Sequence, residues 1–271
     1  MIIIRGAGDI STGTIHRLFR AGFDVMALET ERPSAIRRQV AFSEAVYDGT
    51  ATVEDVTAVR IDHAGQAEEI LRQGKIPLLL DPAGESIRQL KPEAAVDAIL
   101  AKKNTGTTPD MAPLTIALGP GFEAGKDVQY VIETMRGHNL GRIICHGSAA
   151  PNTGIPGIIA GYGEERVIRS PAKGIFRQEK EIGSETAAGE RIGAVLAGEE
   201  EIPVRTRIAG FLRGILRDGY PVTEGFKVAD VDPRPGEKKN CFTISDKARC
   251  IAGSVLELVT AATVNRERLP H

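Results

Sequence analysis

The first half of the chain alternates short, unbroken apolar runs with segments whose apolar residues recur at helical spacing. Ile15, Leu18 and Phe19 follow that spacing and predict a helix over 12–20. The apolar runs predict buried strands at 2–5, 23–28, 76–80, 96–100, 113–118 and 141–145. Further helices are predicted at 66–73 and directly after Asp127. Fully apolar strands alternating with helices are typical of a mostly parallel α/β sheet covered on both faces.

The pattern changes in the second half, where the helical period is lost and an internal repeat begins. Residues 169–195 align without a gap with residues 205–231, at an offset of 36, so that Gly174 falls on Gly210. Two interlocking β halves of this kind resemble the barrel-sandwich hybrid of lipoyl and biotinyl domains. The connection between the halves, LAGEEEIP at 196–203, lacks the lysine that carries the prosthetic group there. We therefore expect neither lipoyl nor biotin.

These patterns predict three parts of the chain. A Rossmann-like α/β domain is expected over 1–164, a two-fold repeat β module over 165–234, and a C-terminal strand and helix over 235–271. Ser245 is the predicted N-cap of that last helix, with Asp246 in its first turn.

Composition excludes several classes of protein. The formal net charge of −2 provides no basic surplus, so a nucleic-acid partner is not expected. Apolar runs stay well short of the roughly 20 residues that a membrane span needs. Cys145, Cys241 and Cys250 are odd in number and widely spaced, which argues against a disulfide framework and against a zinc site. We expect a cytoplasmic protein without a metal site. Homo-oligomerisation stays open.

The glycine-rich turn GAGDISTG follows the first strand and is the first candidate site. Gly6 and Gly8 fit a dinucleotide-binding fingerprint, and Glu29 stands where a ribose-binding acid would be. The third glycine does not fit, because Gly13 comes two residues late. Asp9 would also repel the pyrophosphate that this helix terminus would otherwise attract. Nucleotide or cofactor binding, ordinary NAD binding and a purely structural turn all remain open.

Other candidates follow later strands of the predicted sheet. The candidate ligand-binding residues beyond the first turn are Lys102, Asn104, Gly119, Gly121, Arg136, His138 and Asn152. Because ligands gather at the carboxyl ends of parallel strands, we expect these positions to converge at one edge of the sheet. Each has a structural alternative: solvated lysines, turn formation, or a histidine stabilised at a helix end. Cys241 is either a thiol activated at a helix start or an inert buried thiol. No catalytic residue is assigned.

Several long phrases together resemble one family over essentially the whole chain. They are GAGDISTG, HRLFRAGF, IRRQVAFSEAV, LAKKNTGT, LGPGFEAGKDVQYVIETMRGHNLGR, NTG and CFTISDKAR. They resemble the selenium-dependent molybdenum hydroxylase maturation proteins, a group allied to the maturation factors of xanthine and CO dehydrogenases. The resemblance implies a Rossmann-like domain and an accessory role in equipping such hydroxylases.

The expected function is therefore maturation or insertion of the molybdenum cofactor, with a selenium-dependent hydroxylase as partner. The ligand would be a small, anionic, nucleotide- or pterin-like molecule, and the molybdenum cofactor itself is one candidate. Two alternatives stay open. One is an NAD(P)-dependent oxidoreductase, and the other is a non-catalytic protein whose repeat module docks a partner.

Overall fold

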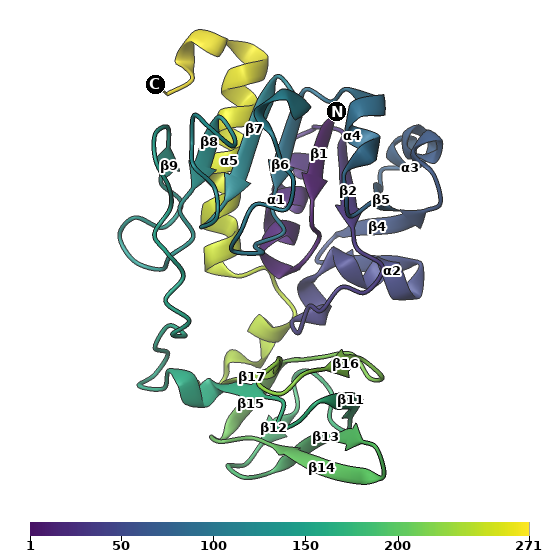
Figure 1. The fold of residues 1–271 in the computed structure, drawn as a ribbon, viewed down its shortest axis with the longest axis vertical. Coiled ribbons are helices and arrows are strands. Elements are labelled where there is room, and N and C mark those ends of the chain that lie inside the picture. The colour runs from purple at the N-terminus through teal and green to yellow at the C-terminus, as the bar shows by residue number, and fades with distance from the viewer. Residues whose placement is uncertain (271) are drawn as a thin grey trace. The chain divides into compact units, whose positions relative to one another are not determined.

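The apolar runs of the first half form a nine-stranded sheet in the order β3-β4-β5-β2-β1-β6-β7-β8-β9 (Figure 1). The strands are β1 (Ile2–Arg5), β2 (Val25–Glu29), β3 (Thr50–Val53), β4 (Val56–Ile61), β5 (Ile76–Leu80), β6 (Ala94–Asp97), β7 (Leu114–Leu118), β8 (Tyr130–Ile132) and β9 (Ile143–Ile144). Neighbouring strands run parallel from β4 to β8, and only β3 and β9 at the two edges are antiparallel. The predicted α/β class with a mostly parallel sheet is confirmed.

The computed structural model describes residues 1–270, and the chain divides into two units. Unit 1 contains Met1–Pro33, Ala41–Thr153 and the chain from Ile244 onward, whereas unit 2 contains Ser34–Val40 and Gly154–Thr243. The nine-stranded sheet belongs to unit 1. Within residues 1–270, no helix combines the length and the apolar character needed to cross a membrane.

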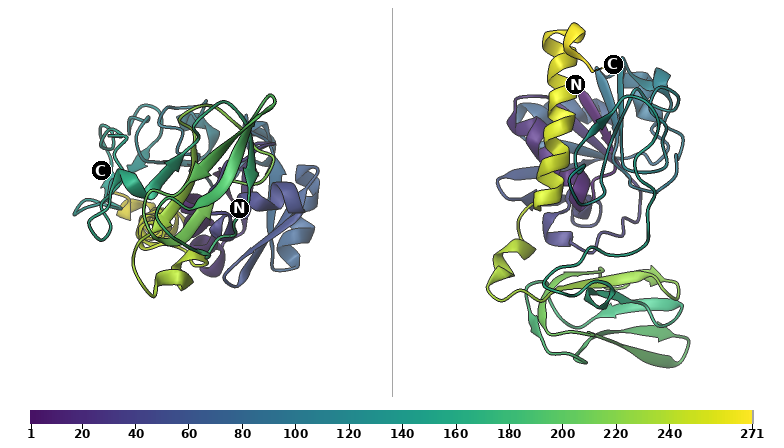
Figure 2. Two further views of the ribbon diagram at one scale, coloured as in Figure 1. Left: turned by 90° about the horizontal axis from the view of Figure 1, so that it is seen from below. Right: turned by 90° about the vertical axis from the view of Figure 1, so that its left-hand side faces the viewer.

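Helices cover the sheet of unit 1. They are α1 (Asp9–Arg20), α2 (Ala45–Asp48), α3 (Ala67–Arg72), α4 (Glu85–Leu90) and α5 (Asp246–Val264). Side chains alternate across a strand, so Ile3 and Met26 face one side, where they pack with Ala67 of α3 and Ile87 of α4. The long helix α5 lies against α1 (Figure 2). Gly13 makes this close approach possible, because a Cβ there would lie 2.8 Å from the Cβ of Ala248.

The helix predicted after Asp127 is wrong, because β8 occupies that place. Asp127 does not cap a helix: its Oδ2 accepts a hydrogen bond from the backbone N–H of Glu123, 2.8 Å away, and closes a turn. Val131 and Ile132 are fully buried, as expected of β-branched residues in a strand between two neighbours. The strand expected at 96–100 is also displaced, since β6 ends at Asp97.

Unit 2 consists of two four-stranded antiparallel sheets, β10-β17-β15-β12 and β14-β13-β11-β16. Their strands are β10 (Val167–Arg169), β11 (Gly174–Gln178), β12 (Glu185–Thr186), β13 (Arg191–Ala197), β14 (Glu200–Arg205), β15 (Gly210–Ile215), β16 (Pro221–Val222) and β17 (Lys227–Asp232). The starts of β11 and β15 are 36 residues apart, as are those of β12 and β16 and of β13 and β17. The two halves exchange one strand each, since β12 pairs with β15 and β16 pairs with β11.

A segment from the first half of the chain also belongs to unit 2. The backbone N–H of Ile215 donates to the carbonyl of Ile36, 2.8 Å away. Arg38 donates back to the carbonyl of Ile215 over 2.9 Å and to Oε1 of Gln178 over 2.7 Å. Gly214 is needed here, because a Cβ would lie 2.9 Å from the Ile36 carbonyl oxygen. The segment Ser34–Val40 is thus hydrogen-bonded into the β module.

Candidate functional site

The strand order of unit 1 reverses beside β1, which has β2 on one side and β6 on the other. From β6 the sheet continues outward through β7 and β8. In open α/β sheets, ligands bind outside the carboxyl ends of the strands at such a reversal, because the connecting loops diverge there. The candidate site is therefore the edge at which β1, β6, β7 and β8 end. We call it the carboxyl edge.

The glycine turn after β1 forms the centre of this edge. Gly6 has a φ of +92° and passes close to the exit of β6, since a Cβ would lie 2.9 Å from the carbonyl oxygen of Ala98. Gly8 is the N-cap residue of α1 and provides no side-chain cap. The first-turn amides of α1 therefore lack a partner from their own cap residue. A Cβ at Gly8 would meet no atom within 4 Å, so the backbone is open at that point.

Glu29, at the end of β2, holds this turn in place. Its Oε2 accepts from the backbone N–H of Ala7 over 2.8 Å, and its Oε1 accepts from the N–H of Thr30 over 2.8 Å. Burial raises the pKa of the Glu29 carboxyl, and these two backbone hydrogen bonds oppose that shift. Both oxygens are thus engaged with the backbone.

A cluster of charged side chains lies where α1 and α5 begin and where β8 ends. Lys247, in the first turn of α5, is half-buried. Burial lowers its pKa, and the nearby Arg136 lowers it further, whereas the carboxylates of Asp9, Glu133 and Asp246 raise it. The burial outweighs the three carboxylates, so the ammonium form is disfavoured relative to water. The sequence analysis interpreted SDKAR as a helix cap and did not single out Lys247.

Two members of this cluster are already engaged. Arg136 donates a bidentate pair of hydrogen bonds to Asp246, with Nη1 to Oδ2 at 2.9 Å and Nη2 to Oδ1 at 3.1 Å. The buried Glu133 accepts from the backbone N–H groups of Met135 over 2.7 Å and of Ala150 over 2.8 Å. Glu133 therefore fixes the backbone after β8.

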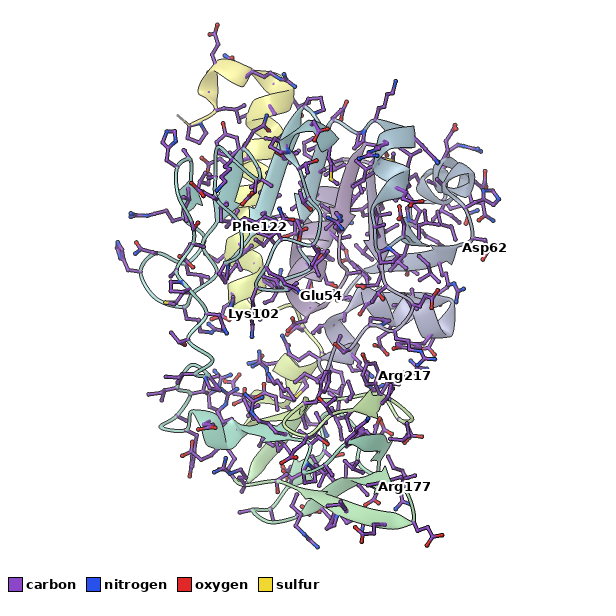
Figure 3. The ribbon with its side chains drawn as sticks, in the orientation of Figure 1. Glu54, Asp62, Lys102, Phe122, Arg177 and Arg217 are labelled. Carbon is purple, nitrogen blue, oxygen red and sulfur yellow. The ribbon has the colours of Figure 1, made fainter. Side chains whose placement is uncertain are left out.

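The loop after β6 carries Lys102 and Asn104. Lys102 is exposed, has a φ of +64° and is labelled in Figure 3. Asn104 forms the turn itself: its Oδ1 accepts from the N–H groups of Gly106 and Thr107, each at 2.8 Å, and its Nδ2 donates to the Thr107 carbonyl over 2.8 Å. Gly121 allows the neighbouring loop to pass, since a Cβ there would lie 2.5 Å from the backbone nitrogen of Lys103.

The remaining candidates are placed around this edge in different ways. Gly119 follows β7 directly, and a Cβ there would lie 2.6 Å from Oγ1 of Thr134. His138 and Asn152 are exposed on loops beyond β8. Gly13 lies inside α1 against α5, so helix packing accounts for the absence of its side chain.

A buried ion pair links the ends of two strands at the carboxyl edge. Arg5 and Asp97, at the ends of β1 and β6, are 1% and 2% exposed. Nη1 of Arg5 lies 3.4 Å from Oδ2 of Asp97, and the hydroxyl of Thr107 donates to the same oxygen over 2.6 Å. Arg5 also donates to the carbonyl of Pro82 over 3.0 Å. This network fixes the loop that carries Lys102 relative to β1 and β6.

Two other features lie outside the carboxyl edge. Cys241 is fully buried in the core of unit 2, and burial raises the pKa of its thiol, which favours the interpretation as an inert thiol.

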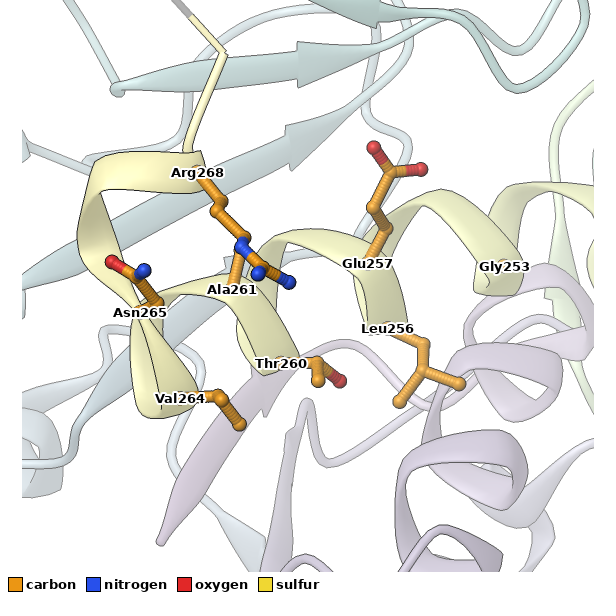
Figure 4. Close-up of a pocket in the computed structure, with 8 residues that line it drawn as sticks. All are labelled: Gly253, Leu256, Glu257, Thr260, Ala261, Val264, Asn265 and Arg268. Carbon is orange, nitrogen blue, oxygen red and sulfur yellow. The ribbon is translucent and has the colours of Figure 1, made fainter.

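A groove of about 550 Å³ follows α5 and the short 3₁₀ turn after it (Figure 4). Because its lining comes only from residues between Gly253 and Arg268, it is a furrow along one segment of the chain.

No family model matches the chain. A curated relative, the uncharacterized protein YqeB of Escherichia coli (strain K12), is 51% identical over 257 residues, which cover 95% of this chain and 47% of the relative. The chain therefore spans about half the length of the curated relative that it matches.

Among solved structures, the apo ectoine utilization protein EutE (DoeB) of Ruegeria pomeroyi is 11% identical, covers 86% of each chain and gives a TM-score of 0.30. A succinylglutamatedesuccinylase/aspartoacylase of Rhodobacter sphaeroides is 21% identical over 34% of this chain and 30% of its own, with a TM-score of 0.24.

These findings correct the family and the function expected from the sequence. The similar structures carry the descriptions EutE and succinylglutamate desuccinylase or aspartoacylase, not molybdenum hydroxylase maturation protein. The expected family, the role in molybdenum cofactor maturation, the selenium-dependent hydroxylase partner and the nucleotide- or pterin-like ligand are therefore wrong. The oxidoreductase and docking alternatives gain no support either. With TM-scores of 0.24 and 0.30, the likeness transfers no activity to this chain.

Proposed function

We propose that unit 1 binds a small polar molecule at the carboxyl edge, with Lys247 and Asp9 as its main polar contacts. The observation that carries the proposal is the half-buried Lys247, whose pKa is lowered by burial despite three neighbouring carboxylates. Groups with perturbed pKa values cluster at functional sites, because binding and catalysis often require a charged group in an environment that shifts its pKa.

The chemistry of the edge defines what the ligand must offer. An ammonium donates hydrogen bonds and accepts none, so Lys247 requires an acceptor such as a carbonyl or carboxyl oxygen. Asp9 accepts from a hydroxyl or amino group. The open backbone at Gly8 allows a close approach to the first turn of α1. The ligand therefore carries both hydrogen-bond donors and acceptors. Its outer parts would contact Lys102, Gly119, Gly121, Arg136 and His138.

Native mass spectrometry of the protein purified from its own cells tests the proposal first. A bound compound, or one found by thermal-shift screening of small polar metabolites, would then be titrated by calorimetry. Lys247→Met should weaken its binding by about 1.5–3 kcal/mol, roughly 10- to 150-fold, as for the loss of a charged hydrogen bond. Lys126→Met is the matched control, because Lys126 is exposed and pairs only with Glu123 over 3.0 Å. Equal weakening in both variants, or no compound found by either method, would refute the proposal.

We also propose finer descriptions of the two units. The reversal of strand order at β1 supports a Rossmann-like interpretation of unit 1. The exchange of β12 and β16 between the two halves supports a barrel-sandwich hybrid in unit 2. The division at 1–164, 165–234 and 235–271 stays a prediction, as does the cytoplasmic location inferred from the cysteines.

A further inference from the structure

A histidine and two carboxylates from distant parts of the chain meet on unit 1. His16 lies in the middle of α1, and Glu54 and Asp55 form the turn between β3 and β4 (Glu54 is labelled in Figure 3). Nε2 of His16 is 2.8 Å from Oδ1 of Asp55 and 3.8 Å from Oε2 of Glu54. The three ligand atoms all lie within 4.8 Å of one another. We call these residues the His16 cluster.

The second oxygen of each carboxylate is held by another group. Oε1 of Glu54 accepts from Nη2 of Arg249 over 2.6 Å and from the backbone N–H of Ile244 over 3.0 Å. Oδ2 of Asp55 lies 3.5 Å from Nη1 of Arg20. The oxygens left over are the two that face His16. Outer partners of this kind orient ligating carboxylates in metal sites.

We propose that His16, Glu54 and Asp55 bind one divalent transition-metal ion, with Zn²⁺ the best fit. Imidazole and carboxylate are ordinary zinc ligands, and three protein ligands leave a fourth position for water. Bonds of about 2.0–2.2 Å in a tetrahedron place ligand atoms about 3.3–3.6 Å apart. The separations of 2.8 and 3.8 Å lie on either side of that range, so the three ligand atoms are already close to the spacing that one ion requires.

The charges around the cluster affect how tightly it would bind an ion. Arg20 and Arg249 balance the two carboxylates, so the bound ion adds net positive charge, and weaker binding than in a closed structural zinc site is expected.

The site escaped the sequence analysis, which judged zinc binding from the three cysteines. No spacing motif joins His16 to Glu54 and Asp55, since they come from a helix and from a hairpin turn. This metal site is independent of the small molecule proposed at the carboxyl edge, because His16, Glu54 and Asp55 are not among the residues proposed to contact that molecule.

Calorimetric titration of the chelator-stripped protein, residues 1–271, with ZnCl₂ tests the site. The wild-type protein should bind one ion and gain thermal stability. His16→Gln and Asp55→Asn should each lower the affinity at least 10-fold and abolish that gain. His146→Gln is the matched control, because His146 is exposed and lies outside the cluster.

Circular dichroism checks that each variant is folded. If His16→Gln does not fold, Asp55→Asn alone tests the site, because Asp55 lies at an exposed turn. The proposal is overturned if the wild-type protein shows no one-to-one binding. It is equally overturned if the folded cluster variants bind Zn²⁺ as tightly as the wild type.

Discussion

Two glycines inside helices of unit 1 should respond in opposite ways to the same substitution. Gly13 lies in α1, where a new Cβ would be 2.8 Å from the Cβ and 3.0 Å from the carbonyl carbon of Ala248. Gly253 lies in α5, where a new Cβ would meet no atom within 4 Å. We therefore expect Gly13→Ala to destabilise the protein and Gly253→Ala to stabilise it.

The magnitudes follow from two competing effects. Alanine is favoured over glycine in a helix interior by about 0.8–1.0 kcal/mol, and both variants gain this. Carbon atoms pack best at about 3.5–4.0 Å, so the new methyl at residue 13 must push α1 and α5 apart by several tenths of an ångström. The neighbouring atoms include backbone, which cannot rotate away. Overpacking of this kind costs about 1–3 kcal/mol. The steric effect wins at Gly13, whereas helix propensity alone acts at Gly253.

Thermal unfolding followed by circular dichroism measures the comparison. The propensity gain cancels between the two variants, so their difference isolates the steric term of about 1–3 kcal/mol. For domains of about 150–250 residues this corresponds to a separation in Tm of roughly 2–12 °C. If Gly13→Ala were as stable as Gly253→Ala, the close contact between α1 and α5 could not be as described.

Three further predictions concern other parts of the chain. Asp97→Ala leaves the charge of Arg5 buried without its partner and should cost about 3–5 kcal/mol in urea unfolding; a loss below about 1 kcal/mol would contradict the ion pair. Lys247 has a lowered pKa in the folded state. At alkaline pH below about 10.5 the unfolded state therefore binds more protons at this residue than the folded state does, and the free energy of unfolding of the wild type should increase as pH rises through that range. Lys247→Met should lack this increase when unfolding midpoints are compared at pH 7 to 10, and parallel pH profiles would count against it. Gly193→Ala places a Cβ against the carbonyl oxygen of Arg177 in the next strand and should lower the Tm of unit 2 measured by calorimetry, whereas an unchanged Tm would argue against that approach.

The sequence predicted the buried strands well because parallel strands are covered on both faces and must be apolar throughout. The run at 76–80 became β5 without change. The predicted N-cap Ser245 is also confirmed, since its side chain accepts from the backbone N–H of Ala248 over 3.2 Å. Both features depend on neighbours in the sequence. The prediction of a helix after Asp127 failed because the same residues can form a helix or a turn followed by a strand. The strand forms because β8 pairs with its neighbours in the sheet, and these lie elsewhere in the sequence.

The candidate site was less accessible to sequence reasoning because its charges meet only in the fold. Asp9 and Lys247 are 238 positions apart, and each is an ordinary first-turn residue of its own helix. Glu29 shows the opposite case. Its place in the sequence resembles that of a ribose-binding acid, yet both of its oxygens accept from the backbone of the protein itself.

The packing of α5 on α1 has a consequence during synthesis, because α1 is made long before α5. Gly13 and Ala248 are 235 residues apart, so the ribosome has to add 235 residues before α1 can meet its partner. At synthesis rates of about 5–20 residues per second, the surface of α1 that packs against α5 stays uncovered for roughly 12–50 s. We therefore expect chaperones to bind the nascent chain until α5 has emerged.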